Sequence, residues 1–187
     1  MAVVDTIVAQ ALVDLQSADL AQRRSAAKAL FKQARLEHTG ARRDALGRPE
    51  VVDALRMALE ESDPTVLEQA TGALGMIFTR YYRDERAYPA LVRLTKSPRK
   101  LTRLWAATAV ARLDRPDRWA ILKPLLADKN PEVKQQVCRM IIDGCMASAL
   151  TTEDKNALKP GIEVLTADPD PGVRTLAQNA LGAVNIV

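Results

Sequence analysis

The chain has 187 residues and a formal net charge of +4, and 48% of its residues are hydrophobic although only 4% are aromatic. A core with so few aromatic rings must be built from Leu, Val and Ala. Ala and Leu are the strongest apolar helix formers, so the composition favours packed helices over a strand-rich fold. No apolar run approaches the roughly 18 residues that indicate a membrane span. The N-terminal residues do not follow the pattern of a signal peptide, so we expect a cytoplasmic protein without a membrane segment.

The first predicted element is an amphipathic helix over residues 3–16. Its apolar residues recur at helical spacing and form one stripe: Val4, Ile7, Val8, Ala11, Leu12 and Leu15. A second helical segment, "ADLAQRRSAAKAL", follows from Ala18 to Leu30. Residues 3–37 are therefore predicted to form a helical hairpin.

The segment "LEHTGARRDALGRPE", residues 36–50, separates this hairpin from the next one. Its two glycines and its polar residues predict a long connecting loop. Long loops in compact arrays are often functional. Arg42 and Arg43 are therefore predicted to form a secondary contact site.

The remaining chain repeats the pattern of the first hairpin. Amphipathic segments over 49–60, 86–96, 116–127 and 153–167 each precede a second segment, and these second segments are "SDPTVLEQATGALG", "SPRKLTRLWAATAVARL", "KNPEVKQQVCRMI" and "DPDPGVRTLAQNALG". One small or aliphatic position recurs in the five second segments, at Ala26, Ala70, Ala106, Val137 and Ala177. The separations are 44, 36, 31 and 40 residues, and a drifting period near forty is typical of helical-hairpin solenoids.

The linking turns and second helices, as in "ADPDPGVRTLAQNAL" and "ADKNPEVKQQV", resemble HEAT repeats. The proline-containing segments "YPALVRL", "KPLLAD" and "KPGIEVL" extend the resemblance to the first helices. It implies an all-α fold, a right-handed α-solenoid of about five HEAT-like hairpins within a single domain over 1–187. The expected hairpins cover 3–37, 49–82, 86–113, 116–147 and 153–184. The resemblance also implies that the second helices line the inner, concave face.

The turns before the second helices follow one pattern. Asp63, Asn130 and Asp170 stand immediately before a proline, which suits a cap residue followed by proline at the first helical position. A basic residue follows the valine of the repeat pattern in several copies: Lys134 and Arg174, and more loosely Arg23 and Arg103. The resemblance implies that these basic residues bond carboxylates or carbonyls of the turns, such as those around Asp128 and Asp168.

The sequence has no recognisable catalytic constellation. Nucleophile elbows and glycine-rich phosphate loops are missing, and His38 is the sole histidine, which makes histidine-based catalysis implausible. Cys138 and Cys145 lie seven residues apart in one predicted helix. That is about 10 Å along the axis, too far for a relaxed disulfide. We therefore expect a non-enzymatic protein with reduced thiols and neither a cofactor nor a metal.

The positive charge is concentrated in the middle of the chain, because residues 80–118 hold 11 basic and 4 acidic side chains. A helical projection places Arg99, Lys100 and Arg103 on the side opposite Trp105, so we expect these three to be exposed and Trp105 to be core. Gly72 does not fit the repeat pattern. It predicts a shallow groove with Gly72 and Gly75 as its floor and Arg83, Arg99 and Arg103 as its walls, although close helix packing is the alternative.

These features favour a scaffold or adaptor that binds a partner protein or peptide, with an acidic segment, on its concave face. A first alternative is nucleic-acid binding, because HEAT-like alkylpurine DNA glycosylases use such folds to cradle a duplex. A second alternative is a HEAT protein of the bilin-lyase type, although no residue here points to a tetrapyrrole. The sequence leaves the oligomeric state open.

Overall fold

The computed structural model describes residues 3–36 and 39–186, and throughout this part of the chain the regular elements are all helices. His38 lies outside the described residues. The first helices of the repeats are α1 (Val3–Leu15), α4 (Pro49–Met57) with the 3₁₀ turn η1 (Ala58–Glu60), α6 (Tyr88–Leu94) after η2 (Glu85–Ala87), α8 (Arg118–Leu122) with η3 (Lys123–Ala127), and α10 (Thr152–Leu165). The second helices are α2 (Leu20–Arg35), α5 (Pro64–Arg80), α7 (Lys100–Arg112), α9 (Pro131–Met146) and α11 (Pro171–Asn185).

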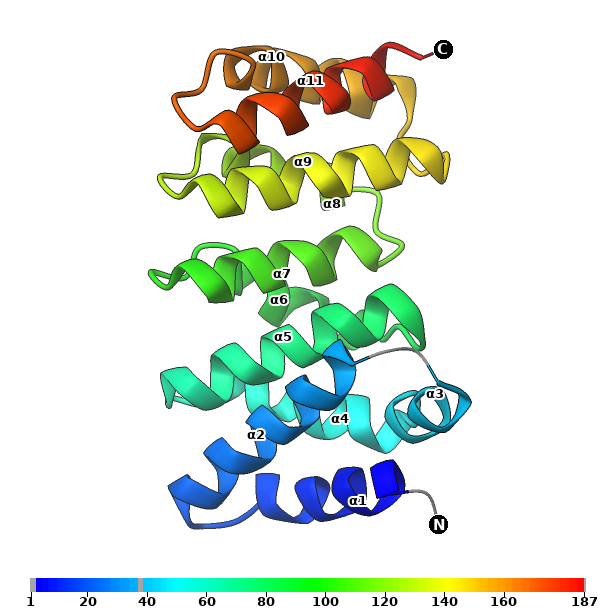
Figure 1. Ribbon diagram of the computed structural model, residues 1–187, viewed down its shortest axis with the longest axis vertical. Helices are drawn as coiled ribbons and strands as arrows, with labels where there is room; N and C mark the ends of the chain where they lie inside the picture. The colour runs from blue at the N-terminus through cyan, green and yellow to red at the C-terminus, as the bar shows by residue number, and fades with distance from the viewer. Residues whose placement is uncertain (1–2, 37–38, 187) are drawn as a thin grey trace.

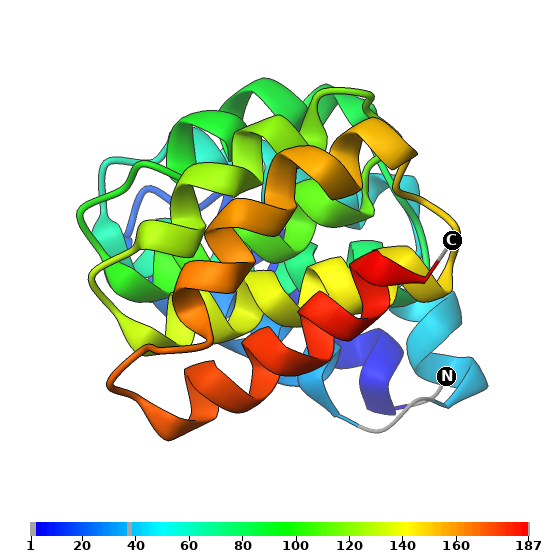
Figure 2. The same ribbon diagram turned by 90° about the horizontal axis from the view of Figure 1, so that it is seen from above.

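The helices form consecutive antiparallel pairs that stack along one axis. Each second helix packs against the second helix of the next pair, so that α2, α5, α7, α9 and α11 form one layer (Figure 1). The first helices of the later pairs form a separate layer behind them (Figure 2). The prediction of an all-α repeat solenoid is confirmed.

The segment between the first two pairs differs from the prediction of a loop, because it contains a further helix, α3 (Gly40–Leu46). The side chain of Thr39 caps this helix by accepting a hydrogen bond from the backbone N–H of Arg42 at 3.3 Å. Ala45 and Leu46 are buried, and α3 packs against α1. The segment is therefore a part of the core rather than only a connection.

The three predicted residues all occupy cap positions, and the side chains of two of them make cap bonds. Asp63 accepts hydrogen bonds from the backbone N–H groups of Thr65 and Val66 at 3.1 and 3.0 Å, and Asp170 accepts one from Val173 at 2.8 Å. Asn130 occupies the predicted cap position before Pro131, but its side chain makes no cap bond to α9. Its amide oxygen accepts a hydrogen bond from an arginine of α7 instead, as described below.

The helix α5 is crossed by two aromatic side chains from its neighbours. Phe31 of α2 and Trp105 of α7 meet edge to face, with ring centroids 5.1 Å apart and planes inclined by 77°. A Cβ atom added at Gly72 of α5 would lie 2.8 Å from the Phe31 ring, and one added at Gly75 would lie 3.2 Å from the carbonyl oxygen of Trp105. Gly72 therefore provides the room for the Phe31 ring, and Gly75 allows the backbone of α7 to lie close to α5. Trp105 is half-buried, at the edge of the core.

This packing predicts that Gly72→Ala destabilises the protein. The Phe31 ring is held in place by Trp105 and cannot move away from the new methyl group. We expect the free energy of unfolding to fall by about 1–3 kcal/mol, the usual cost of overpacking. The matched control is Gly182→Ala, because no atom lies within 4 Å of a Cβ at that helical position. The control should be neutral or stabilising by up to about 1 kcal/mol. Urea denaturation measures both, and equal effects would contradict the packing role of Gly72.

Candidate functional site

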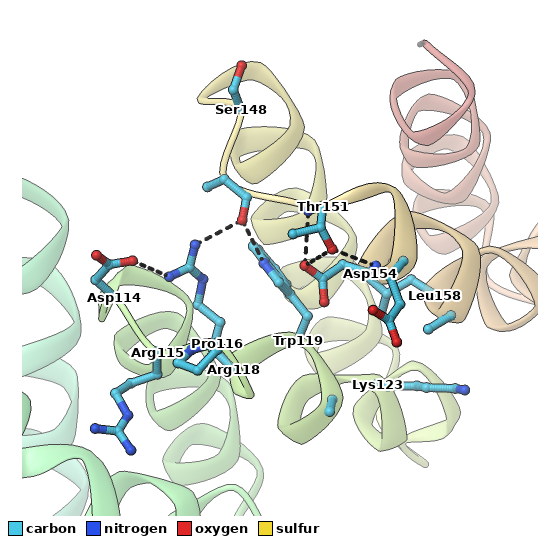
Figure 3. Close-up of a pocket in the computed structure, with 14 residues that line it drawn as sticks. Asp114, Arg115, Pro116, Arg118, Trp119, Lys123, Ser148, Thr151, Asp154 and Leu158 are labelled. Carbon is cyan, nitrogen blue, oxygen red and sulfur yellow. Dashed lines mark hydrogen bonds and ion pairs between the residues drawn. The ribbon is translucent and has the colours of Figure 1, made fainter.

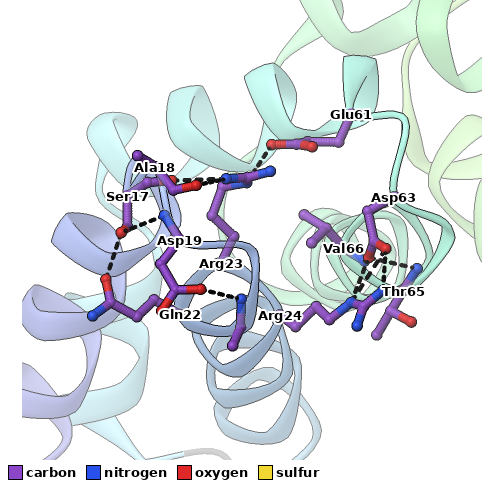
Figure 4. Close-up of polar contacts among 11 residues, drawn as sticks. Ser17, Ala18, Asp19, Gln22, Arg23, Arg24, Glu61, Asp63, Thr65 and Val66 are labelled. Atoms are coloured by element: carbon purple, nitrogen blue, oxygen red, sulfur yellow. Dashed lines mark hydrogen bonds and ion pairs between the residues drawn. The ribbon is translucent and has the colours of Figure 1, made fainter.

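Ion pairs connect each repeat to the next at the turns that precede the second helices. We call such a pair a rung when it joins a second helix to the turn of the following repeat. The first rung joins Arg24 of α2 to Asp63, with Nη2 and Oδ2 2.6 Å apart (Figure 4). Arg23 supports it by pairing with Glu61 at 2.8 Å and by donating to carbonyl oxygens of its own turn. The hydrogen bond from Arg24 is the main reason why the pKa of Asp63 falls from 3.8 to about 2.

The rungs between the later repeats are more deeply buried. Arg103 of α7 donates from Nε and Nη2 to the two carboxylate oxygens of Asp128, at 2.6 and 2.8 Å, and from Nη2 to the side chain of Asn130 at 2.8 Å. The side chains of Arg103 and Asp128 are only 8% and 6% exposed. Lys134 of α9 pairs in the same way with Asp168. The expected bonding of basic residues to turn carboxylates is therefore present.

The rung between the second and third repeats has the opposite polarity. Here the second helix supplies the acid, Glu68 of α5, and the turn supplies the base, Arg99, with Nη2 and Oε2 3.1 Å apart. Arg99 stands at the cap position of α7, where the neighbouring repeats have Asp63 and Asn130. The two repeats are still joined by an ion pair, although the acid and the base have exchanged places. Arg99 is therefore paired rather than a free basic side chain.

The structure corrects the groove predicted from the sequence. Gly72 and Gly75 are buried, and the ring of Phe31 fills the space above Gly72, so these glycines are not the floor of an open groove. The predicted exposure of Arg103 is wrong, because this residue forms a buried rung. The alternative that the sequence left open, close packing of helices, is the correct one.

The other predicted site residues are dispersed and mostly engaged. Lys100 pairs with Glu132 of α9 at 2.7 Å, and Arg83 is exposed and donates to the carbonyl oxygen of Phe78 at 3.2 Å. On α3, Arg42 donates to the side chain of Gln33 at 3.4 Å, while Arg43 pairs with the adjacent Asp44 on the surface. Within the basic middle segment, carboxylates that are distant in sequence pair with Arg93, Arg99, Lys100, Arg103 and Arg112.

A different basic surface is found on α2, whose sequence holds five basic residues and no acidic one. Arg24 and Arg23 are used in ion pairs, but Lys28, Lys32 and Arg35 are exposed, with no carboxylate of the described residues paired with them. The guanidinium carbon of Arg35 lies 5.4 Å from the centre of the Phe31 ring. Counting charges along the chain missed this surface, because residues 1–79 carry a net negative charge. Counting charges within the second helix only, which has no acidic residue, could have identified this basic surface.

The carboxylates of the second helices are all paired within the described chain. The helices α2, α7 and α11 have none, and the acids of α5 and α9 pair as Glu68 with Arg99, Glu132 with Lys100, and Asp143 with Arg112. Lys28, Lys32 and Arg139 have no such partner among the described residues and are exposed. The layer of second helices therefore presents uncompensated positive charge.

A cleft of about 910 Å³ lies between the fourth and fifth repeats, beside α8 and the start of α10 (Figure 3). Arg118 crosses one wall and donates to the carbonyl oxygens of Leu113 and Ala149 at 2.8 and 2.9 Å. On the other wall Thr151 and Asp154 cap α10 through mutual hydrogen bonds (Figure 3). These polar groups hold the turns in place, and the lining mixes acidic and basic side chains.

Both cysteines, Cys138 and Cys145, are free thiols, and burial raises the pKa of Cys138 to about 11. Within residues 3–36 and 39–186 no group of three or more His, Cys, Asp or Glu side chains is placed to hold a metal ion. Among the helices described here, none has the length and the hydropathy needed to cross a membrane.

The sequence pattern of the family described as HEAT repeats matches residues 9–111 and 58–142. No curated protein shows significant similarity to this chain. Among solved structures, a designed armadillo repeat protein in complex with the peptide (KR)4 is 20% identical, with a TM-score of 0.76 over 97% of this chain and 82% of that one. An engineered protein from the Northeast Structural Genomics Consortium is 23% identical, with a TM-score of 0.73 over 98% and 80% of the two chains. At these identities the likeness concerns the fold.

The buried rung of Arg103 predicts a large loss of stability when it is broken. Arg103→Ala leaves Asp128 without its partner in a buried position, and we expect the free energy of unfolding to fall by about 3–5 kcal/mol. Arg43→Ala is the control, because Arg43 and Asp44 are both more than 65% exposed and such a surface change usually costs no more than about 0.5 kcal/mol. Chemical denaturation compares the two variants. A similar loss in both would show that the rungs do not hold the repeats together.

Proposed function

Since this chain belongs to the HEAT-repeat family, we propose that it is a non-enzymatic scaffold whose layer of second helices binds an acidic segment of a partner protein. Repeat scaffolds of this kind are typically non-enzymatic and offer an extended, preformed surface to other proteins. Armadillo-like structures of similar shape include computationally designed proteins for modular peptide recognition, with a TM-score of 0.75 to this chain. They support a peptide or protein as the class of partner.

The charge balance of the second helices favours an acidic partner. Their carboxylates are ion-paired, whereas Lys28, Lys32 and Arg139 are exposed without a carboxylate partner among the described residues. A surface with uncompensated positive charge attracts an anionic partner and speeds its association. The (KR)4 peptide of the designed neighbour is basic, so the two proteins would differ in the charge of their ligands.

The pairing of basic side chains in the middle repeat makes nucleic-acid binding the less favoured alternative. A duplex binder needs a track of cations along the phosphates, but Arg99, Lys100 and Arg103 of the middle repeat are all neutralised. No described group favours the bilin-lyase alternative. Arg42 and Arg43 stay predicted contacts of a secondary site, and Arg83 stays a predicted partner contact. The free thiols fit the reducing environment of the cytoplasm, where we place the protein.

Selection of peptides from a random display library on the full chain tests the proposal. We expect the enriched peptides to be rich in Asp and Glu, to bind saturably, and to shift NMR signals of exposed positions on the second helices. Their affinity should fall as salt is added, because the attraction is between exposed charges.

Two results would contradict the scaffold proposal. One is the failure to enrich any saturable peptide, and the other is a set of shifts confined to first-helix positions such as Met57 and Val164, which are exposed on the opposite layer. A DNA duplex that binds more tightly than the peptides, with a steep salt dependence, would favour the nucleic-acid alternative.

A further inference from the structure

We infer that the acidic segment is anchored where α2 and α7 meet, with a large apolar side chain on Leu101 and Trp105 and its carboxylates on Lys28, Lys32 and Arg35. This inference rests on the proposed function and assigns the position and the chemistry of the contact. The contact between Phe31 and Trp105 brings the two helices together across the glycines of α5. A basic helix and an apolar patch thereby become parts of one surface.

The apolar part of the site lies on α7. Leu101 is 42% exposed, and Trp105, one turn further along the same helix, is half-buried. The Trp105 ring is held by its edge-to-face contact with Phe31, so its position is set before a ligand arrives. Fixed aromatic side chains flanked by aliphatic ones are typical centres of binding energy in protein interfaces, because an apolar anchor gains area there at little entropic cost.

The basic part of the site lies along α2, next to Phe31. Lys28, Lys32 and Arg35 follow each other at intervals of four and three residues on its exposed side, and Arg35 stacks on the Phe31 ring. Successive cations are therefore about 6 and about 4.5 Å apart along the helix axis. Carboxylates two residues apart in an extended segment, or four apart in a helix, have nearly the same spacing.

The surroundings favour a peptide over a nucleic acid. Beyond α7 the surface continues with neutral pairs, because Lys100 and Arg112 are paired with acids of α9 and Gln136 donates to Thr108 at 3.0 Å. Apart from Arg139 on α9, the uncompensated charge is thus concentrated on α2, and it suits a short segment with a few carboxylates. The aliphatic side chain of Leu101 beside the ring suits an apolar side chain better than a row of stacked bases.

The test compares charge reversals that change the net charge equally. Lys28→Glu/Lys32→Glu alters the proposed site, and Lys96→Glu/Lys123→Glu alters exposed lysines of the turn before α7 and of η3. The probes are the peptides selected on the unmodified chain, and a single-stranded oligonucleotide of equal length is the comparison. We expect the first variant to weaken peptide binding by at least about tenfold, which is 1.4 kcal/mol, and the second by less than about twofold. Leu101→Ser should also weaken binding, by about fivefold, with an unchanged melting temperature.

Equal weakening by the two double variants would overturn the inference, since only the overall charge would then matter. Unchanged binding in both Lys28→Glu/Lys32→Glu and Leu101→Ser would also overturn it, and so would tighter binding of the oligonucleotide than of the peptides. If the selected peptides still bind and shift signals of α9 and α11, the scaffold function stands and only this site is wrong. Failure to select any peptide would instead remove the proposed function itself.

Discussion

The rungs between repeats determine how the helical pairs stack on one another. Burying a charged carboxylate in a turn is costly unless a cation with good hydrogen-bond geometry compensates it. Asp128 meets this condition through Arg103, and Asp168 does so through Lys134. Because each cation comes from the preceding second helix, the rungs fix how one repeat sits on the next. The reversed pair of Glu68 and Arg99 shows that the contact is kept even when the charges are exchanged.

The rungs also decide which basic side chains remain for a partner. The middle segment holds most of the excess positive charge, yet five of its basic side chains form ion pairs with carboxylates of other helices and turns. The second helix of the first repeat, α2, contains no acid, and it keeps three cations next to the ring of Phe31. The proposed binding surface therefore lies where basic side chains have no carboxylate partner, rather than where basic residues are most frequent in the sequence.

Local patterns made much of the fold predictable. The Asp-Pro steps identified the starts of α5 and α11, and the recurring small residues identified the second helices. The helix α3 was missed because a seven-residue helix between glycines resembles a loop, although Thr39 is a regular cap. The site was missed for another reason. Arg103 and Asp128 are 25 residues apart, and Phe31, Gly72 and Trp105 come from three helices. The periodicity of a single helix carries no information on such contacts.

Rung formation separates structural cations from available ones, and this separation can be measured as the reactivity of individual lysines. Lys134 is 13% exposed and paired with Asp168, whereas Lys28 and Lys32 are exposed on α2. Labelling of the folded chain with an amine-specific reagent, followed by peptide mass spectrometry, gives the rate at each lysine. We expect fast labelling of Lys28 and Lys32 and slow labelling of Lys134, with the difference abolished by denaturant. Labelling of Lys134 at the rate of Lys28 in the folded chain would contradict this expectation.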